Sequence, residues 1–224
     1  MATWIIHLRI AEKLYKEFDC LELDKTGFYL GNIAINSGKV NDDLSLSPPR
    51  YISHWFEDST KKYGCRYKDF FQTFLNEELD IFSFSFYLGC VAHLITDNIW
   101  YQKIVQKTKD KYRKELNEDY KFILQPKKDW YDVDYLFIRD HPNFEPLDML
   151  SEVKGFKNIY LPWFDEDSIQ LKLDELLEFY KTIPNNIDRD YLYFNSDEME
   201  KFVDYTEWIV KQELLHLLNV DNSL

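Results

Sequence analysis

The longest apolar stretch of the chain, residues 81–95, most constrains the fold because it has to be buried on nearly every side. It belongs to a segment from Asp80 to about Lys109 that contains no proline and is apolar almost all round at its centre. The stretch includes Ser83, Ser85 and His93, and it is shorter than the ~20 residues that a bilayer requires. The pattern therefore predicts a long buried central helix as the spine of the domain.

Helical spacing of apolar residues recurs in most of the remaining chain. Thr3 is a candidate N-cap for a helix over about 4–18, and Gly38 would end a second helix over 26–37. Further helices are expected near 67–79, 130–140, 144–153, 167–182 and 197–219. Alternating strand patterns are scarce outside 190–194, and no Gly/Ser-rich linker divides the chain. The sequence predicts an all-α fold, a compact multi-helix bundle with residues 1–224 as a single domain.

Charge and cysteine content limit the partners and the compartment. The 40 acidic residues exceed the 27 basic ones, and the net charge of −13 disfavours nucleic acid and acidic membranes. Cys20, Cys65 and Cys90 show no C-x-x-C spacing, which indicates reduced thiols. The first residues lack a basic leader, so we expect a cytoplasmic protein with no signal peptide and no transmembrane segment. The oligomeric state is left open.

The sharpest local motif is His93-Leu94-Ile95-Thr96-Asp97, inside the predicted spine. Residues four apart lie on one face of a helix, so the imidazole and the carboxylate point the same way. Burying both groups is costly unless they pair with each other or bind a cation. The spacing alone leaves two alternatives, a structural His–Asp pair and a metal site.

Two further histidines lie on separate apolar segments. His7 follows Ile6 on the first predicted helix, and His54 precedes Trp55 just after a double proline. Each of them alone fits a hydrogen-bonded or packed core residue. Together with His93 and Asp97, however, they place four ligand-type side chains within the first hundred residues, on segments that could converge.

Four segments carry a family resemblance: 4–11, 28–34, 52–56 and 87–100. In order and spacing, over about residues 1–105, they resemble the zinc-dependent phospholipase C family. The resemblance implies the all-helical fold shared with P1 nuclease, in which helices surround one to three Zn²⁺ ions. It implies that His54, His93 and Asp97 hold one zinc, and that His7 holds another with Asp97 as the bridging carboxylate.

Two positions depart from the family pattern. Asn36 stands where the family has an aspartate that binds metal and serves as candidate general base. Its amide oxygen can approach a metal, but Asn36 cannot accept a proton. Trp4 follows three residues instead of opening the mature chain, so we expect its ring to be packed. The implied metal ligands are His7, His54, His93, Asp97 and Asn36, with Asp97 and Asn36 as the catalytic positions.

Other donors in the sequence have ordinary explanations. Asp42 and Asp43 fit a solvated loop, Asp132 and Asp134 a helix start, His141 a cap just before Pro142, and His216 a position on an amphipathic terminal helix. Glu145 only completes an H-x-x-x-E spacing with His141. A contribution from Asp132, Asp134, His141 or Glu145 to the metal site is left open.

The resemblance implies a metal-dependent hydrolase acting on a phosphate ester, a phospholipase C-like phosphodiesterase that uses a zinc-activated water. The substrate would be a small phosphate ester or a lipid headgroup. The sequence contains no G-x-S-x-G elbow, Walker loop, H-E-x-x-H or dinucleotide fingerprint. Two alternatives remain: a catalytically impaired metal- or ligand-binding protein on the same scaffold, because of Asn36, and a metal-free helical interaction domain.

Overall fold

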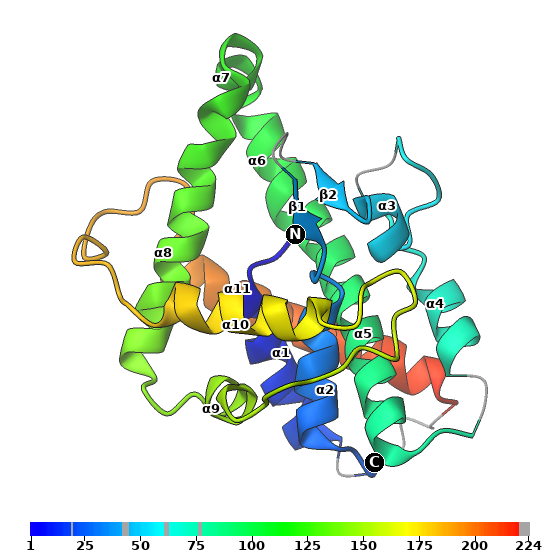
Figure 1. Ribbon diagram of the computed structural model, residues 1–224. Helices are drawn as coiled ribbons and strands as arrows, with labels where there is room; N and C mark the ends of the chain where they lie inside the picture. The colour runs from blue at the N-terminus through cyan, green and yellow to red at the C-terminus, as the bar shows by residue number, and fades with distance from the viewer. Residues whose placement is uncertain (19, 42–44, 61–62, 76–77, 220–224) are drawn as a thin grey trace.

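The chain folds into helices that surround a buried central helix, α5 (Figure 1). The computed structural model describes residues 1–224 except 19, 42–44, 61–62, 76–77 and 220–224. Strand is limited there to a small antiparallel pair, β1 (Lys39–Val40) and β2 (Leu46–Ser47). The predicted all-α class is confirmed. None of the helices in these ranges is long and apolar enough to cross a membrane.

The central helix α5 spans Ile81–Trp100 and is buried through its C-terminal half. It begins at Asp80, whose side chain accepts a hydrogen bond from the backbone N–H of Ser83 at 2.9 Å. The helix continues as a π-helical segment, η1 (Tyr101–Val105), and then as α6 (Gln106–Lys111). The spine predicted from the apolar pattern is therefore present, but it changes its winding after Trp100.

Helices α1 (Trp4–Glu17) and α2 (Lys25–Ala34) pack beside α5. Thr3 caps α1, as the sequence predicts. Helix α2 ends earlier than the predicted residue 37, because residues 35–37 turn tightly, with the N–H of Ser37 bonded to the carbonyl of Ala34. This turn carries Asn36 away from the helix axis and toward the end of α3 (Arg50–Ser53), next to His54.

Two glycines allow α2 and α5 to approach each other closely. A Cβ atom added at Gly31 would lie 2.0 Å from the carbonyl oxygen of Phe86, and one added at Gly89 would lie 2.3 Å from that of Phe28. Any side chain at either position would push the two backbones apart. The close approach brings the backbone carbonyl of Asn32 within 2.7 Å of His93 Nδ1.

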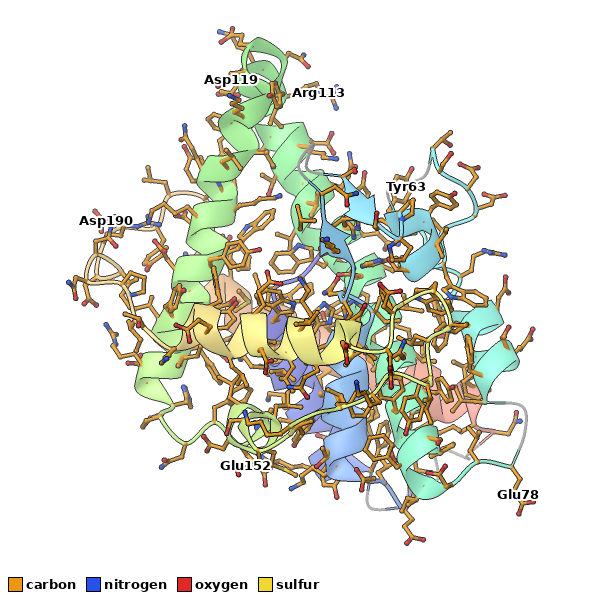
Figure 2. All side chains as sticks on the ribbon, in the orientation of Figure 1. Tyr63, Glu78, Arg113, Asp119, Glu152 and Asp190 are labelled. Carbon is orange, nitrogen blue, oxygen red and sulfur yellow. The ribbon has the colours of Figure 1, made fainter. Side chains whose placement is uncertain are left out.

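An arm made of α6, α7 (Arg113–Glu118), the 3-10 turn η2 (Tyr120–Ile123) and α8 (Leu124–Asp140) projects from the body (Figure 1). Arg113 and Asp119 mark its tip in Figure 2. Helix α8 begins six residues before the predicted start at 130, because Pro126 occupies the first turn, where a missing N–H costs no hydrogen bond.

The remaining helices close the core. Helix α11 (Ser196–Leu217) packs against α1, α5 and α8, while α10 (Ser168–Tyr180) contacts α2 and α9 (Glu145–Ser151). Helix α4 (Tyr67–Phe74) covers another part of α5. Residues 190–194 are irregular despite their alternating pattern, since the N–H groups of Tyr193 and Phe194 donate to the Asp129 carboxylate instead of to a strand.

Candidate metal centre

Three buried side chains from two helices meet at the centre of the structure. His7 comes from α1, and His93 and Asp97 come from consecutive turns of α5. One donor atom from each of the three lies within 4.8 Å of the other two. His7 Nε2 is 3.5 Å from Asp97 Oδ1, and His93 Nε2 is 3.8 Å from Asp97 Oδ2. The two imidazole rings stack with their centroids 3.8 Å apart.

His54 and Asn36 extend this cluster on the side of α3. His54 Nε2 lies 3.6 Å from Asp97 Oδ2, and Asn36 Oδ1 lies 3.1 Å from the same nitrogen. The hydroxyl of Ser53 lies 2.8 Å from His54 Nδ1. The fold thus brings together all five residues that the family resemblance implies as ligands, with Asp97 between the three histidines.

Several donor atoms in the cluster are buried without a hydrogen-bond partner. Among the described residues this holds for both ring nitrogens of His7, for His93 Nε2 and for Asp97 Oδ2. Buried polar atoms are rarely left unpaired, because each one loses its bonds to water. The 3.8 Å between His93 and Asp97 also exceeds hydrogen-bond distance. A direct hydrogen bond between His93 and Asp97 therefore does not explain why both are buried on one helix face.

The contacts behind the cluster orient His93 as a ligand. His93 Nδ1 lies 2.7 Å from the carbonyl oxygen of Asn32, so this nitrogen carries the proton and donates it. The lone pair of Nε2 then faces Asp97, an arrangement typical of metal-bound histidine. Two ligands of one tetrahedral zinc are separated by about 3.4 Å, given bond lengths of about 2.0–2.1 Å. The separations of 3.5 and 3.8 Å from Asp97 are close to this value.

The electrostatics of the site set the protonation states that metal binding requires. Burial, with a smaller effect of His7, lowers the pKa of His93 to about 3. Burial, followed by the charge of Arg50, lowers the pKa of His54 well below its ordinary value. Burial alone would raise the pKa of Asp97, but the α-amino group of Met1 and the two nearest histidines together hold it well below the usual range. The neutral imidazoles of His54 and His93 thus face an ionised carboxylate.

The first residues of the chain also reach the cluster. The backbone N–H of Ala2 donates to Asp97 Oδ1 at 2.9 Å, and Met1 Sδ lies 3.1 Å from His54 Nε2. The Trp4 ring packs edge-on against Phe179 and Tyr180, with centroids 5.9 and 6.2 Å away. The packed position expected for Trp4 is what the structure shows.

A cleft of about 450 Å³ opens beside His54 and Asn36. Its wall includes four cationic side chains, from Arg50, Lys109, Lys127 and Lys172. Arg50 Nη2 lies 3.8 Å from Asp97 Oδ2. Sequence reasoning missed Arg50, although its position four residues before His54 was a usable signal. The cleft is locally basic in a chain whose net charge is −13.

The other donors considered from the sequence lie in different surroundings. Asp134 accepts hydrogen bonds from Thr3 and Tyr180, Asp132 pairs with Arg189, and Glu145 pairs with Lys25. His141 is exposed, with Nδ1 beside the Phe137 carbonyl, and His216 is exposed on the surface of α11. The expected helix start is wrong for Asp132 and Asp134, which lie in the middle of α8 because that helix begins at Leu124, and His141 caps the end of α8 instead of the start of a new helix. Asp42 and Asp43 lie outside the described residues.

Comparisons of the chain with models of protein families, with curated proteins and with solved structures found no match.

Proposed function

We propose that the protein is a metal-dependent hydrolase that acts on a phosphate ester, with Zn²⁺ as its metal. One observation carries the proposal: His7, His93 and Asp97 each have a buried donor atom without a hydrogen-bond partner within the described chain, and one donor atom from each of the three lies within 4.8 Å of the other two. Nitrogen and carboxylate donors in this combination suit zinc. A bound cation would compensate the buried negative charge of Asp97 and would use the free lone pairs.

Each residue of the cluster has a distinct part in the proposed site. His93 would bind through Nε2 while the Asn32 carbonyl holds its Nδ1 proton. Asp97 faces His7 with Oδ1 and both His54 and His93 with Oδ2, so one carboxylate can serve two ions. We propose one to three ions on this basis. When bound, the zinc would supply Lewis-acid stabilisation and lower the pKa of a coordinated water toward ~7.

The cleft supports a substrate that carries a phosphate group. Arg50 lies at the cluster itself and Lys127 lines the same cavity, so their charges attract and orient phosphoryl oxygens, whereas Lys172 is paired with Glu175 in the cavity wall. Arg50 and Lys127 also counteract the repulsion that the net charge of −13 exerts on an approaching anion. A small phosphate ester and a lipid headgroup share this chemistry.

A second candidate function rests on Asn36. Its amide oxygen lies 3.1 Å from His54 Nε2, within reach of a metal bound there, but it carries no charge and accepts no proton. The same scaffold would then bind a metal or a ligand with little turnover. The Asn36→Asp variant separates the two candidates, because it restores a carboxylate at the edge of the cleft.

The test is metal content, measured by elemental mass spectrometry on protein purified without a metal-affinity tag. We expect about one or more zinc ions per chain in the wild type and a loss of zinc in His93→Ala. The matched control is His216→Ala, which removes an exposed histidine outside the cluster and should retain the metal. Circular dichroism verifies that both variants are folded. Wild-type protein that takes up no zinc when the ion is supplied would contradict the metal site.

Hydrolysis of a chromogenic phosphodiester by the zinc-loaded protein tests the activity. Turnover by the wild type that is lost in His93→Ala supports the hydrolase. Turnover that appears only in Asn36→Asp supports the second candidate instead. Zinc binding without turnover in either protein would support the metal site but contradict the proposed hydrolase activity.

A further inference from the structure

A second cavity, of about 410 Å³, lies between η1 and α6 on one side and the first half of α11 on the other. Four lysines line it: Lys103, Lys107 and Lys111 from η1 and α6, and Lys201 from α11. The three lysines on the arm are spaced four residues apart, so they project from one helix face. Tyr101, Val105 and Lys109 line the metal-site cleft instead. One helical segment thus separates two cavities, and the lysine-lined cavity is distinct from the proposed metal centre.

One carboxylate, that of Glu198, lines the same cavity, so the protein offsets the four lysine charges only in part. Where the structure describes the chain, none of these lysines forms an ion pair with a carboxylate, although Asp110 lies on α6 and several acidic residues lie on α11. Asp110 pairs with Arg113, and on α11 Glu200 and Asp204 pair with Arg9 and Lys13 of α1. Like charges four residues apart on a helix repel each other. An anionic ligand would relieve that repulsion.

Aromatic rings form the rest of the wall. Lys103 Nζ lies 4.8 Å from the ring centroid of Tyr205, and Lys111 Nζ lies 5.1 Å from that of Tyr112. Tyr112 and Tyr193 meet edge to face, with centroids 5.2 Å apart. Tyr205 is 43% exposed, so its ring is open to a ligand. Exposed aromatic faces of this kind stack on planar rings.

We propose that this cavity binds a small molecule that joins a planar ring to two or more phosphate groups, the chemistry of a nucleoside di- or triphosphate. Lysines bind phosphate as point charges, and several are needed for a polyphosphate. The volume falls within the ~300–1,000 Å³ typical of small-molecule sites. Four lysines converge on this cavity, whereas the net charge of −13 repels an extended polynucleotide.

The experiment is a calorimetric titration of the zinc-supplemented full chain with β,γ-methylene ATP, which does not hydrolyse at its terminal bridge. Inorganic tripolyphosphate and adenosine are titrated as the two separate parts of the ligand. We expect the intact nucleotide to bind more tightly than either part. The double variant Lys107→Gln, Lys111→Gln should weaken binding by about tenfold or more for each lost contact. The Tyr205→Leu variant should bind the nucleotide more weakly but bind tripolyphosphate with unchanged affinity.

Two controls locate the ligand. Lys114→Gln with Lys121→Gln removes two exposed lysines of the same arm that do not line the cavity, and it should leave binding unchanged. Lys127→Gln alters the metal-site cleft only and should also have no effect. A loss of binding in Lys127→Gln would place the nucleotide in the cleft and overturn the proposal. Equal affinity for tripolyphosphate, tighter binding of a 12-nucleotide oligomer, or no binding at all would overturn it as well.

Discussion

Replacing Gly31 or Gly89 by alanine tests whether the contact between α2 and α5 holds the fold and the site together. A new Cβ at Gly31 would lie 2.0 Å from the carbonyl oxygen of Phe86, so the helices must separate by more than 1 Å to restore ordinary contact. Helix propensity alone favours alanine over glycine by about 1 kcal/mol, so it predicts that the substitution stabilises the protein. Overpacking of this kind costs about 1–3 kcal/mol or more in stability. We expect a cost at the upper end of this range, because the new Cβ meets backbone atoms, which cannot rotate away.

The assay is thermal unfolding of the metal-free protein, followed by circular dichroism. For a chain of this size, about 3 kcal/mol corresponds to a fall in Tm of about 6–12 °C. The matched control is Gly38→Ala, because a Cβ there meets nothing closer than 3.5 Å. That variant should match the wild type or gain about 0.4–1 kcal/mol from a less flexible unfolded chain.

The same substitutions connect the helix contact to the site. Moving α2 away from α5 lengthens the 2.7 Å contact between His93 Nδ1 and the Asn32 carbonyl. Loss of such a supporting contact weakens metal binding by about 10–100-fold, which competition with a chelator measures. If Gly31→Ala and Gly89→Ala unfold at or above the Tm of Gly38→Ala, the close approach of the two backbones is wrong.

Three further predictions concern charge and metal. Burial raises the pKa of Asp134 to about 7, so the folded protein keeps a proton that the unfolded chain loses above pH ~4. The free energy of unfolding should therefore fall as pH rises from about 4 to about 7, by at most roughly 4 kcal/mol at ~1.4 kcal/mol per pKa unit. Urea titrations at pH 4.5 and 7.5 measure this fall, and the Asp134→Asn variant should show a smaller one. Zinc at a thousandfold excess over its Kd should stabilise the protein by about 4 kcal/mol and raise Tm by about 8–16 °C. EDTA should reverse this shift in Tm. An equal shift in His93→Ala would contradict zinc binding at this cluster. Asn36→Asp should tighten zinc binding in a chelator competition, because a carboxylate replaces a neutral amide. An unchanged zinc affinity would show that residue 36 is not a zinc ligand.

The sequence by itself determined the helical class, because helical spacing of apolar residues and turn chemistry are local properties. Asp80 and Thr3 cap α5 and α1 through contacts only three residues long. It also determined that His93 and Asp97 share one face of the buried helix, since a spacing of four fixes that geometry before any packing. The winding change after Trp100, the early start of α8 and the irregular path of 190–194 were not predictable in this way.

Only the tertiary structure decided which donors meet. His7 is separated from Asp97 by 90 residues of chain, and whether the two approach depends on how α1 and α2 lie against α5. The two helix glycines set part of that arrangement, and no local pattern reports it. The same holds for Arg50 at Asp97 and for the lysines that line the second cavity, whose surroundings come from distant segments. Periodicity fixes the direction of a side chain relative to its own helix, whereas only packing fixes what it faces.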